Sequence, residues 1–170
     1  MSLSKEKSLL TEIEPYLSRL RYEHNHWDNA IHAYKETERK HWNEFNKNTL
    51  NRVKSVAFES TEIPLPYVHV LDIEKVGYIK PHVDSVRFCG RTIAGLSLLS
   101  PCVMRLALEK DKTKYGDLLL LPRSLYIMRD RSRFEFTHEV LPEDKSIFKG
   151  KCVPRDRRIS IIQRLIPKQA

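Results

Sequence analysis

The residues best suited to chemistry are His82 and Asp84, two positions apart in the run Pro-His-Val-Asp-Ser. Side chains two residues apart in an extended strand point to the same face, so this imidazole and carboxylate can share one ion. A third ligand must come from elsewhere, and the best candidate is His138, which ends the alternating run from Arg133. Two histidines and one carboxylate occupy three corners of an octahedral ferrous ion and leave three open. The spacing therefore predicts an iron site on these three side chains.

A second candidate site lies in the run from Arg158 to Arg164, whose even spacing places both arginines on one face of a strand. Ile159 and Ile161 then face the other way. Two arginines on a mostly apolar face are costly unless something anionic pairs with them. Guanidinium groups bind carboxylates through two parallel hydrogen bonds, so the pattern indicates a dicarboxylate ligand.

His-x-Asp alone is a weak signal, because 7 histidines and 8 aspartates in 170 residues produce one by chance in roughly a third of such chains. The complete set is more specific. His82-x-Asp84, His138 and Arg158-x5-Arg164, in this order, resemble the iron- and 2-oxoglutarate-dependent dioxygenases of the AlkB family. The amino-acid sequence is also similar to that of one mitochondrial branch of the family, most clearly at residues 77–85, 88–90, 93–101 and 157–160. This similarity covers nearly the whole chain.

The resemblance implies an oxidoreductase that uses Fe(II), 2-oxoglutarate and O2. The triad would hold the metal, and Tyr126, Arg158 and Arg164 would bind 2-oxoglutarate. A core tyrosine with a satisfied hydroxyl is the alternative interpretation of Tyr126. The chain departs from the family's repair members where these carry an Asn-x-Tyr pair that contacts the co-substrate, because the matching positions hold Leu71 and Ile73. Tyr126 and the two arginines would then hold the co-substrate largely by themselves.

A second departure concerns the substrate. Repair members read a flipped base beneath lid segments, and a flipped base needs a pocket that stacks it. The 22 residues from Ser60 to Pro81 must supply strands and turns, which leaves little for a lid. The net charge of +8 favours nucleic acid, yet no aromatic residues interleave with the basic second half as a base-stacking platform requires.

Composition predicts one domain, since 41% hydrophobic and 31% charged residues are ordinary for a globular chain of 170 residues. No apolar run approaches the length that spans a membrane. Cys89, Cys102 and Cys152 have no paired spacing, which indicates a reducing compartment, and we interpret all three as small buried hydrophobes. Residues 1–14 have the composition of neither a secretory signal nor a transit peptide. The resemblance nevertheless implies a mitochondrial address, with the presequence not present in this chain.

Residues 8–58 are predicted to be helical, with a capping box at Thr11-x-x-Glu14 and Pro15 in the first turn. The spacing further predicts one buried helical stripe, made of Trp42, Phe45, Thr49, Val53 and Ala57. The histidines of residues 24–28 are expected to cap or to face water, because their spacing is not that of a metal site.

The rest of the chain offers eight short runs typical of strands: 68–73, 78–84, 92–99, 103–108, 117–121, 124–128, 133–140 and 158–165. Residues 118–121 are apolar without alternation, as in a strand covered on both sides. Strands without intervening helices predict a mainly β, α+β fold with a double-stranded β-helix, or jelly-roll, core. We therefore expect a single dioxygenase domain over 1–170, in which a helical buttress (1–58) packs on one sheet of a jelly-roll core (59–170).

Three hypotheses for function follow. The first is oxidative hydroxylation of a protein or other non-duplex substrate by a monomer in mitochondria. The second is removal of N-methyl groups from RNA, structured RNA above all, or from DNA, with methylated duplex DNA disfavoured by the missing lid. The third is a non-catalytic binding module that retains the fold.

Overall fold

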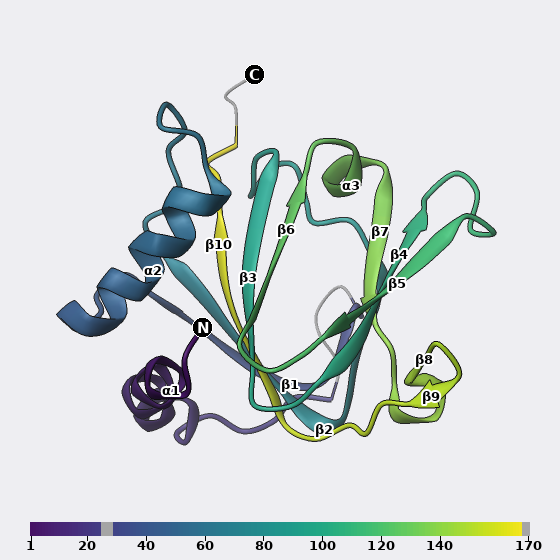
Figure 1. Cartoon of the computed structure of the whole chain (residues 1–170), viewed down its shortest axis with the longest axis horizontal. Helices are drawn as coiled ribbons and strands as arrows, with labels where there is room; N and C mark the ends of the chain where they lie inside the picture. The colour runs from purple at the N-terminus through teal and green to yellow at the C-terminus, as the bar shows by residue number, and fades with distance from the viewer. Residues whose placement is uncertain (25–28, 168–170) are drawn as a thin grey trace.

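The computed structural model describes residues 1–24 and 29–167 (Figure 1). More of the chain lies in strands than in helices. In chain order the elements are α1 (Leu3–Leu17), β1 (Ile31–Arg39), α2 (Glu44–Ala57), β2 (Val68–His82), β3 (Thr92–Leu98), β4 (Cys102–Leu108), β5 (Tyr115–Leu120), β6 (Ser124–Arg129), α3 (Arg131–Phe134), β7 (Phe136–Val140), a 3-10 turn (Glu143–Lys145), β8 (Ile147–Phe148), β9 (Lys151–Cys152) and β10 (Arg158–Arg164).

The main sheet has the strand order β5-β4-β7-β2-β10-β3-β6, with β1 paired to the other edge of β2. All pairings are antiparallel. The sheet curls over itself, so that β4, β5 and β7 lie opposite β3, β6 and β10 (Figure 1). This is the jelly roll that the sequence predicts, and the prediction of a mainly β fold is confirmed. No helix in the described part of the chain is both long and apolar enough to cross a membrane.

The two faces of β10 contribute to two different hydrophobic clusters. Ile159 and Ile161 pack with α1, α2 and the outer face of the sheet, in a cluster that includes Leu9 and Leu50. Ile162 belongs to a separate cluster inside the barrel. The predicted alternation along β10 is confirmed, and it turns the arginine-bearing face away from the helices.

The prediction of continuous helix over residues 8–58 is wrong. Residues 31–39 form β1, which pairs with β2 from Ile31 to Arg39. Their charged residues, Lys35, Glu36, Glu38 and Arg39, favour a helix, but pairing with the buried strand β2 overrides that local preference. Helix α1 also begins earlier than predicted, with Ser2 as its N-cap, so Thr11 lies inside the helix and donates to the Lys7 carbonyl at 2.9 Å. Pro15 lies in the last turn rather than the first.

The predicted helical stripe is partly wrong. Trp42 precedes α2, whose N-cap is Asn43, and Phe45 is 52% exposed. The buried face is made instead of Asn46, Thr49, Leu50, Val53 and Ala57. The N-cap sets this phase, since the side chain of Asn43 accepts from the backbone N–H of Asn46 at 2.9 Å and turns the next residues toward α1.

Four further details of the sequence prediction are corrected. Residues 68–73 and 78–82 form one strand, β2, and Asp84 lies just beyond its end. The predicted strand 133–140 is divided between α3 and β7. Leu118 and Leu121 are 43% and 54% exposed, because β5 is an edge strand and its outer face is uncovered. Cys152 is exposed on the short strand β9, whereas Cys89 and Cys102 are buried as expected.

A buried ionic cluster joins the helical layer to the barrel. Asp72 on β2 is fully buried and accepts from Arg157 at 2.7 Å and from the hydroxyl of Tyr22 at 3.1 Å. Lys35 of β1 lies 3.8 Å from the same carboxylate. We expect Asp72→Ala to cost about 3 kcal/mol, since it leaves the buried Lys35 without its anion and takes from Arg157 one of its two carboxylate partners. For a chain of this size the melting temperature should fall by roughly 6–12 °C, measured by calorimetry. An unchanged melting temperature would contradict this account.

Candidate metal and co-substrate site

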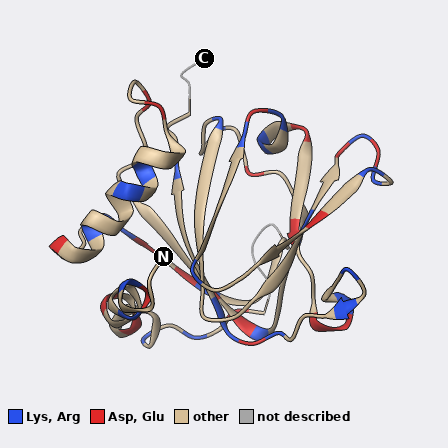
Figure 2. Ribbon diagram, in the orientation of Figure 1, with Lys and Arg blue, Asp and Glu red and all other residues tan. Residues whose placement is uncertain are grey.

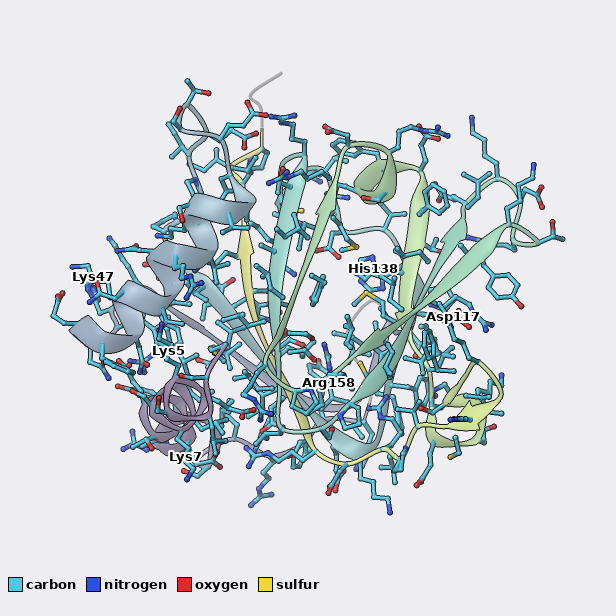
Figure 3. The ribbon with its side chains drawn as sticks, in the orientation of Figure 1. Lys5, Lys7, Lys47, Asp117, His138 and Arg158 are labelled. Atoms are coloured by element: carbon cyan, nitrogen blue, oxygen red, sulfur yellow. The ribbon has the colours of Figure 1, made fainter. Side chains whose placement is uncertain are left out.

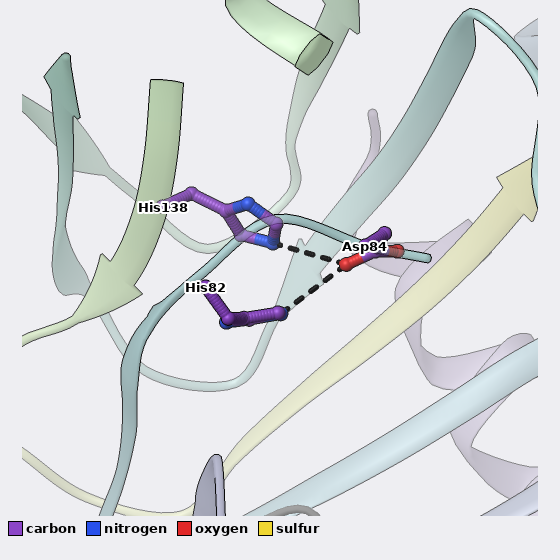
Figure 4. A group of neighbouring side chains, drawn as sticks. All are labelled: His82, Asp84 and His138. Carbon is purple, nitrogen blue, oxygen red and sulfur yellow. Dashed lines mark ion pairs between the residues drawn. The ribbon is translucent and has the colours of Figure 1, made fainter. Parts of the chain in front are cut away.

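The structure brings together the three residues that the sequence proposes as metal ligands. His82 ends β2, and His138 lies opposite it in register on β7. The Oδ1 atom of Asp84 is 3.2 Å from Nε2 of His82 and 3.5 Å from Nε2 of His138 (Figure 4). One donor atom from each residue lies within 4.8 Å of the other two. Strand pairing sets the two imidazoles side by side, and the turn after β2 folds the carboxylate back between them.

The protonation states suit a metal. A carbonyl oxygen can only accept, so the 2.9 Å contact between Nδ1 of His82 and the Lys80 carbonyl puts a proton on Nδ1, and Nε2, which faces Asp84, is the nitrogen that would coordinate a metal. Burial, and after it the charge of His82, lowers the pKa of His138 to about 3, so its ring is neutral at physiological pH. Burial by itself would raise the pKa of Asp84, but the hydrogen bond with His82 and the charges of Arg164 and His138 outweigh it and hold the pKa well below its usual range. A neutral His138 and an ionised Asp84 fit a ferrous ion, and Nε2 of His82 would join them by giving up its proton when a metal binds.

The two arginines of β10 lie in different surroundings. Arg164 donates from Nε to Oδ2 of Asp84 at 3.1 Å and from Nη1 to His69 at 3.0 Å. Arg158 is 1% exposed and donates from Nε to the Ser97 hydroxyl at 3.0 Å, while its buried Nη2 has no hydrogen-bond partner among the described residues. Figure 3 shows Arg158 and His138 in the space between the two groups of strands. A buried guanidinium with an unused N–H group is typical of an anion site.

Tyr126 lies on β6 between the levels of the two arginines, because its β3 partner Gly95 pairs in turn with Ile162 of β10. The described residues give its hydroxyl no hydrogen-bond partner. Burial raises the pKa of Tyr126, although the charges of Arg158 and Arg164 oppose the shift, so the hydroxyl stays a donor. This disfavours the alternative of a core tyrosine with a satisfied hydroxyl.

The wall opposite Tyr126 is apolar. Leu71 and Ile73, at the positions where repair members carry polar contacts, are 3% and 0% exposed and form one cluster against which Tyr126 packs. Polar donors for a dicarboxylate are thus confined to one side of this space.

Gly95 makes room for Tyr126, because a Cβ atom at this glycine would overlap the tyrosine ring. We expect Gly95→Ala to push the ring aside, to cost about 1–3 kcal/mol through overpacking and to weaken 2-oxoglutarate binding. Gly116→Ala on β5 is the matched control, since a Cβ there meets nothing within 4 Å. Thermal unfolding and calorimetric titration of both variants test the expectation, which fails if the two behave alike.

A cavity of about 640 Å³ opens to solvent, and its described lining residues do not include His82, Asp84 or His138. Its walls come from the segments around residues 61–63, 86–91 and 165–167, with Phe134 of α3. Cys89 is one of its lining residues, and its Sγ accepts from Nη2 of the buried Arg133 at 2.9 Å. Sequence reasoning placed no function on Arg133 or on Cys89, and gave no role to His69, since none of the three belongs to a spaced motif.

Comparison with known proteins decides the family. A sequence profile of the 2OG-Fe(II) oxygenase superfamily matches residues 11–164. The chain belongs to the 2OG-Fe(II) oxygenase superfamily. It is 51% identical over 168 residues to the mitochondrial alpha-ketoglutarate-dependent dioxygenase alkB homolog 7 of Bos taurus, and also to that of Mus musculus, covering 99% of this chain and 76% of each relative. A prolyl-4-hydroxylase from Pseudomonas putida shares the fold, with a TM-score of 0.68 at 13% identity over 99% of this chain and 89% of that one.

The prediction of an AlkB-like, 2-oxoglutarate-dependent oxidoreductase is therefore confirmed, and with it the use of Fe(II), 2-oxoglutarate and O2. Membership of this oxygenase superfamily also counts against the hypothesis of a non-catalytic binding module. Family membership does not assign the substrate, because one such site serves many reactions.

Proposed function

We propose that this chain hydroxylates a protein or another non-duplex substrate, with Fe(II) on His82, Asp84 and His138. Bound iron supplies the oxidation, in which one oxygen atom of O2 enters a substrate C–H bond and the other enters succinate as 2-oxoglutarate loses CO2. The chain's own residues orient the reactants, keep His138 neutral and keep the Asp84 carboxylate ionised.

In this proposal the arginines act at opposite ends of 2-oxoglutarate. Six residues of antiparallel strand span roughly 20 Å, so Arg158 and Arg164 cannot grip one carboxylate. The unused Nη2 of Arg158 and the free hydroxyl of Tyr126 both suit the carboxylate remote from the metal. Arg164, tied to Asp84, suits the end beside the metal.

The proposed class of substrate rests on one observation, which is that β2 runs without a break from Val68 to His82. Because β2 occupies Val68–His82, only residues 60–67 remain after α2 and its final turn, and they are tied down. Leu65 donates to the Arg164 carbonyl at 2.7 Å, and Ile63 accepts from Ile166 at 3.0 Å. Nothing in this segment is long enough to cover a flipped base, whereas an open mouth accepts an extended peptide or a single-stranded loop. This supports a protein or non-duplex substrate over methylated duplex DNA.

The proposed address is the mitochondrion. The support for it is that both curated relatives, 51% identical to this chain, carry that location in their names. Fractionation of cells that express the full natural protein tests it, and a cytosolic distribution would count against it.

N-demethylation of RNA is the second candidate, and the net charge of +8 with a pI of about 9.4 favours it. The same site could act on an N-methyl group, since the hydroxylated product sheds formaldehyde. Lysines and arginines are spread over helices, loops and strand ends rather than gathered in one stripe (Figure 2), which gives less support to a path for a nucleic-acid strand.

A direct comparison of substrates tests the proposal. The protein is incubated with Fe(II) and 2-oxoglutarate together with mitochondrial protein extract, structured methylated RNA or methylated duplex DNA. We expect a one-oxygen mass increase on a protein, detected by mass spectrometry, that disappears with the Asp84→Ala variant. Formaldehyde release from RNA alone would promote the second candidate, and efficient release from duplex DNA would contradict the proposal.

A further inference from the structure

We propose that His69 is a positioning residue of the metal centre, because it anchors the guanidinium that orients Asp84. The chain of contacts begins at Glu36 on β1, whose Oε2 lies 2.7 Å from Nε2 of His69. Nδ1 of His69 lies 3.0 Å from Nη1 of Arg164, and Nε of Arg164 lies 3.1 Å from Oδ2 of Asp84. The inference rests on the proposed role of Asp84 as a metal ligand.

The hydrogen-bonding groups of Arg164 and Glu36 allow only one protonation state and tautomer of the His69 ring. A guanidinium has N–H donors and no acceptor, so Nδ1 of His69 must accept from Arg164. An ionised carboxylate only accepts, so Nε2 must carry the proton and donate to Glu36. His69 is therefore neutral, with its proton on Nε2. A proton on Nδ1 would set two donors against each other at Arg164, and the loss of the proton from Nε2 would set two acceptors against each other at Glu36.

Arg164 sets the orientation of the Asp84 carboxylate because it binds only one of its two oxygens. Arg164 binds Oδ2, and this leaves Oδ1 as the oxygen that faces His82 and His138 at 3.2 and 3.5 Å. A carboxylate turns easily about its terminal torsion, so a fixed partner on Oδ2 selects the orientation. The Arg164 side chain has many rotamers of its own, and the bond to His69 removes most of them.

Strand pairing makes this arrangement rigid. His69 is paired with Ile162 of β10 on one side and with Glu38 of β1 on the other. Arg164 is two residues beyond Ile162, and Glu36 two residues before Glu38, so both are diagonal neighbours of His69 on the sheet. The side chain of His69 is 14% exposed, compared with 37% for Glu36, so the anchor is largely shielded from solvent.

The test measures metal binding without turnover, with Co(II) alone as the probe. His69→Leu offers neither a donor nor an acceptor, and we expect about a 10-fold loss of Co(II) affinity by calorimetry. His69→Gln offers one donor and one acceptor and should restore affinity to near that of the wild type, which a merely structural role does not require. Equal affinity of the wild type and the His69→Leu variant would overturn the inference, as would a failure of His69→Gln to restore what His69→Leu loses.

Two controls separate this inference from the proposed function. If Asp84→Ala binds Co(II) as tightly as the wild type, the metal site itself is wrong. If Asp84→Ala loses binding and His69→Leu does not, only the role of His69 fails. Nitrogen NMR of the metal-free wild-type protein gives an answer independent of any variant, since it should show His69 protonated on Nε2 and unprotonated on Nδ1. The opposite form would overturn the inference.

Discussion

Replacing His138 with alanine is expected to abolish iron-dependent conversion of 2-oxoglutarate to succinate. Loss of a residue that merely orients a metal ligand typically costs 10–100-fold in affinity, so loss of one of only three protein ligands should cost at least about 100-fold. The two remaining donors, on His82 and Asp84, come from one short segment and leave the β7 side of the ion uncovered. Calorimetric titration with Fe(II) under anaerobic conditions measures the affinity directly.

The fold should survive this change, because His138 is neutral and its pairing with His82 is made by the backbone. His41→Ala is the matched control, since that histidine is exposed just before α2 and far along the chain from the triad. Circular dichroism and thermal unfolding check that both variants are folded. Undiminished succinate formation by the His138→Ala variant would remove the histidine from the metal site.

The second large effect is expected at Arg158, where one substitution should move stability and binding in opposite directions. Arg158→Met removes a buried cation that has no carboxylate partner among the described residues, so the ligand-free protein should be as stable as the wild type or more so. Loss of a charged hydrogen-bonding partner costs about 1.5–3 kcal/mol, so the apparent affinity for 2-oxoglutarate should fall by roughly 10–150-fold. The rise in melting temperature that 2-oxoglutarate produces in the wild type should be lost with it.

The neighbouring residue supplies the control. Arg157 faces away from the barrel and pairs with Asp72 and Glu14, so Arg157→Met should lower the melting temperature and leave 2-oxoglutarate affinity unchanged. Arg158→Lys is informative as well, because a point charge cannot reproduce the forked geometry of a guanidinium. Unaltered 2-oxoglutarate affinity in the Arg158→Met variant would mean that the co-substrate lies elsewhere.

The parts of this protein that the sequence predicts well are those governed by spacing within one strand. The alternation along residues 158–164 separates Ile159 and Ile161 from Arg158 and Arg164, and it does so whatever lies around the strand. The pairing of His138 with His82 required more, since it depends on which strands become neighbours. The alternating run that ends at His138 indicates this residue as a ligand, and the resemblance to a family makes the choice more specific.

The features that the local sequence pattern does not predict depend on residues far away in the chain. β1 has the composition of a solvated helix, and it is a strand only because β2 lies beside it. The same limit applies to the ion pair between Asp84 and Arg164, which joins residues 80 positions apart. Asp84 itself was expected in a strand, whereas the chain leaves β2 at His82 and turns to bring the carboxylate back. Contacts of this kind follow from the packed tertiary structure and have no signature in a short window of sequence.

The place of β10 in the sheet has a consequence for how the protein acquires its shape. β10 follows the other nine described strands in the chain, yet it lies between β2 and β3. Until it inserts, β2 and β3, which follow each other in the chain but do not pair, present open edges, and the helices have only part of the surface they cover in the finished protein. Contacts between residues so far apart in the chain slow folding, and an emerging chain must remain unpaired, or be held by a chaperone, until β10 arrives. A nonsense mutation just before Arg158 should therefore yield an insoluble product rather than a weakened enzyme.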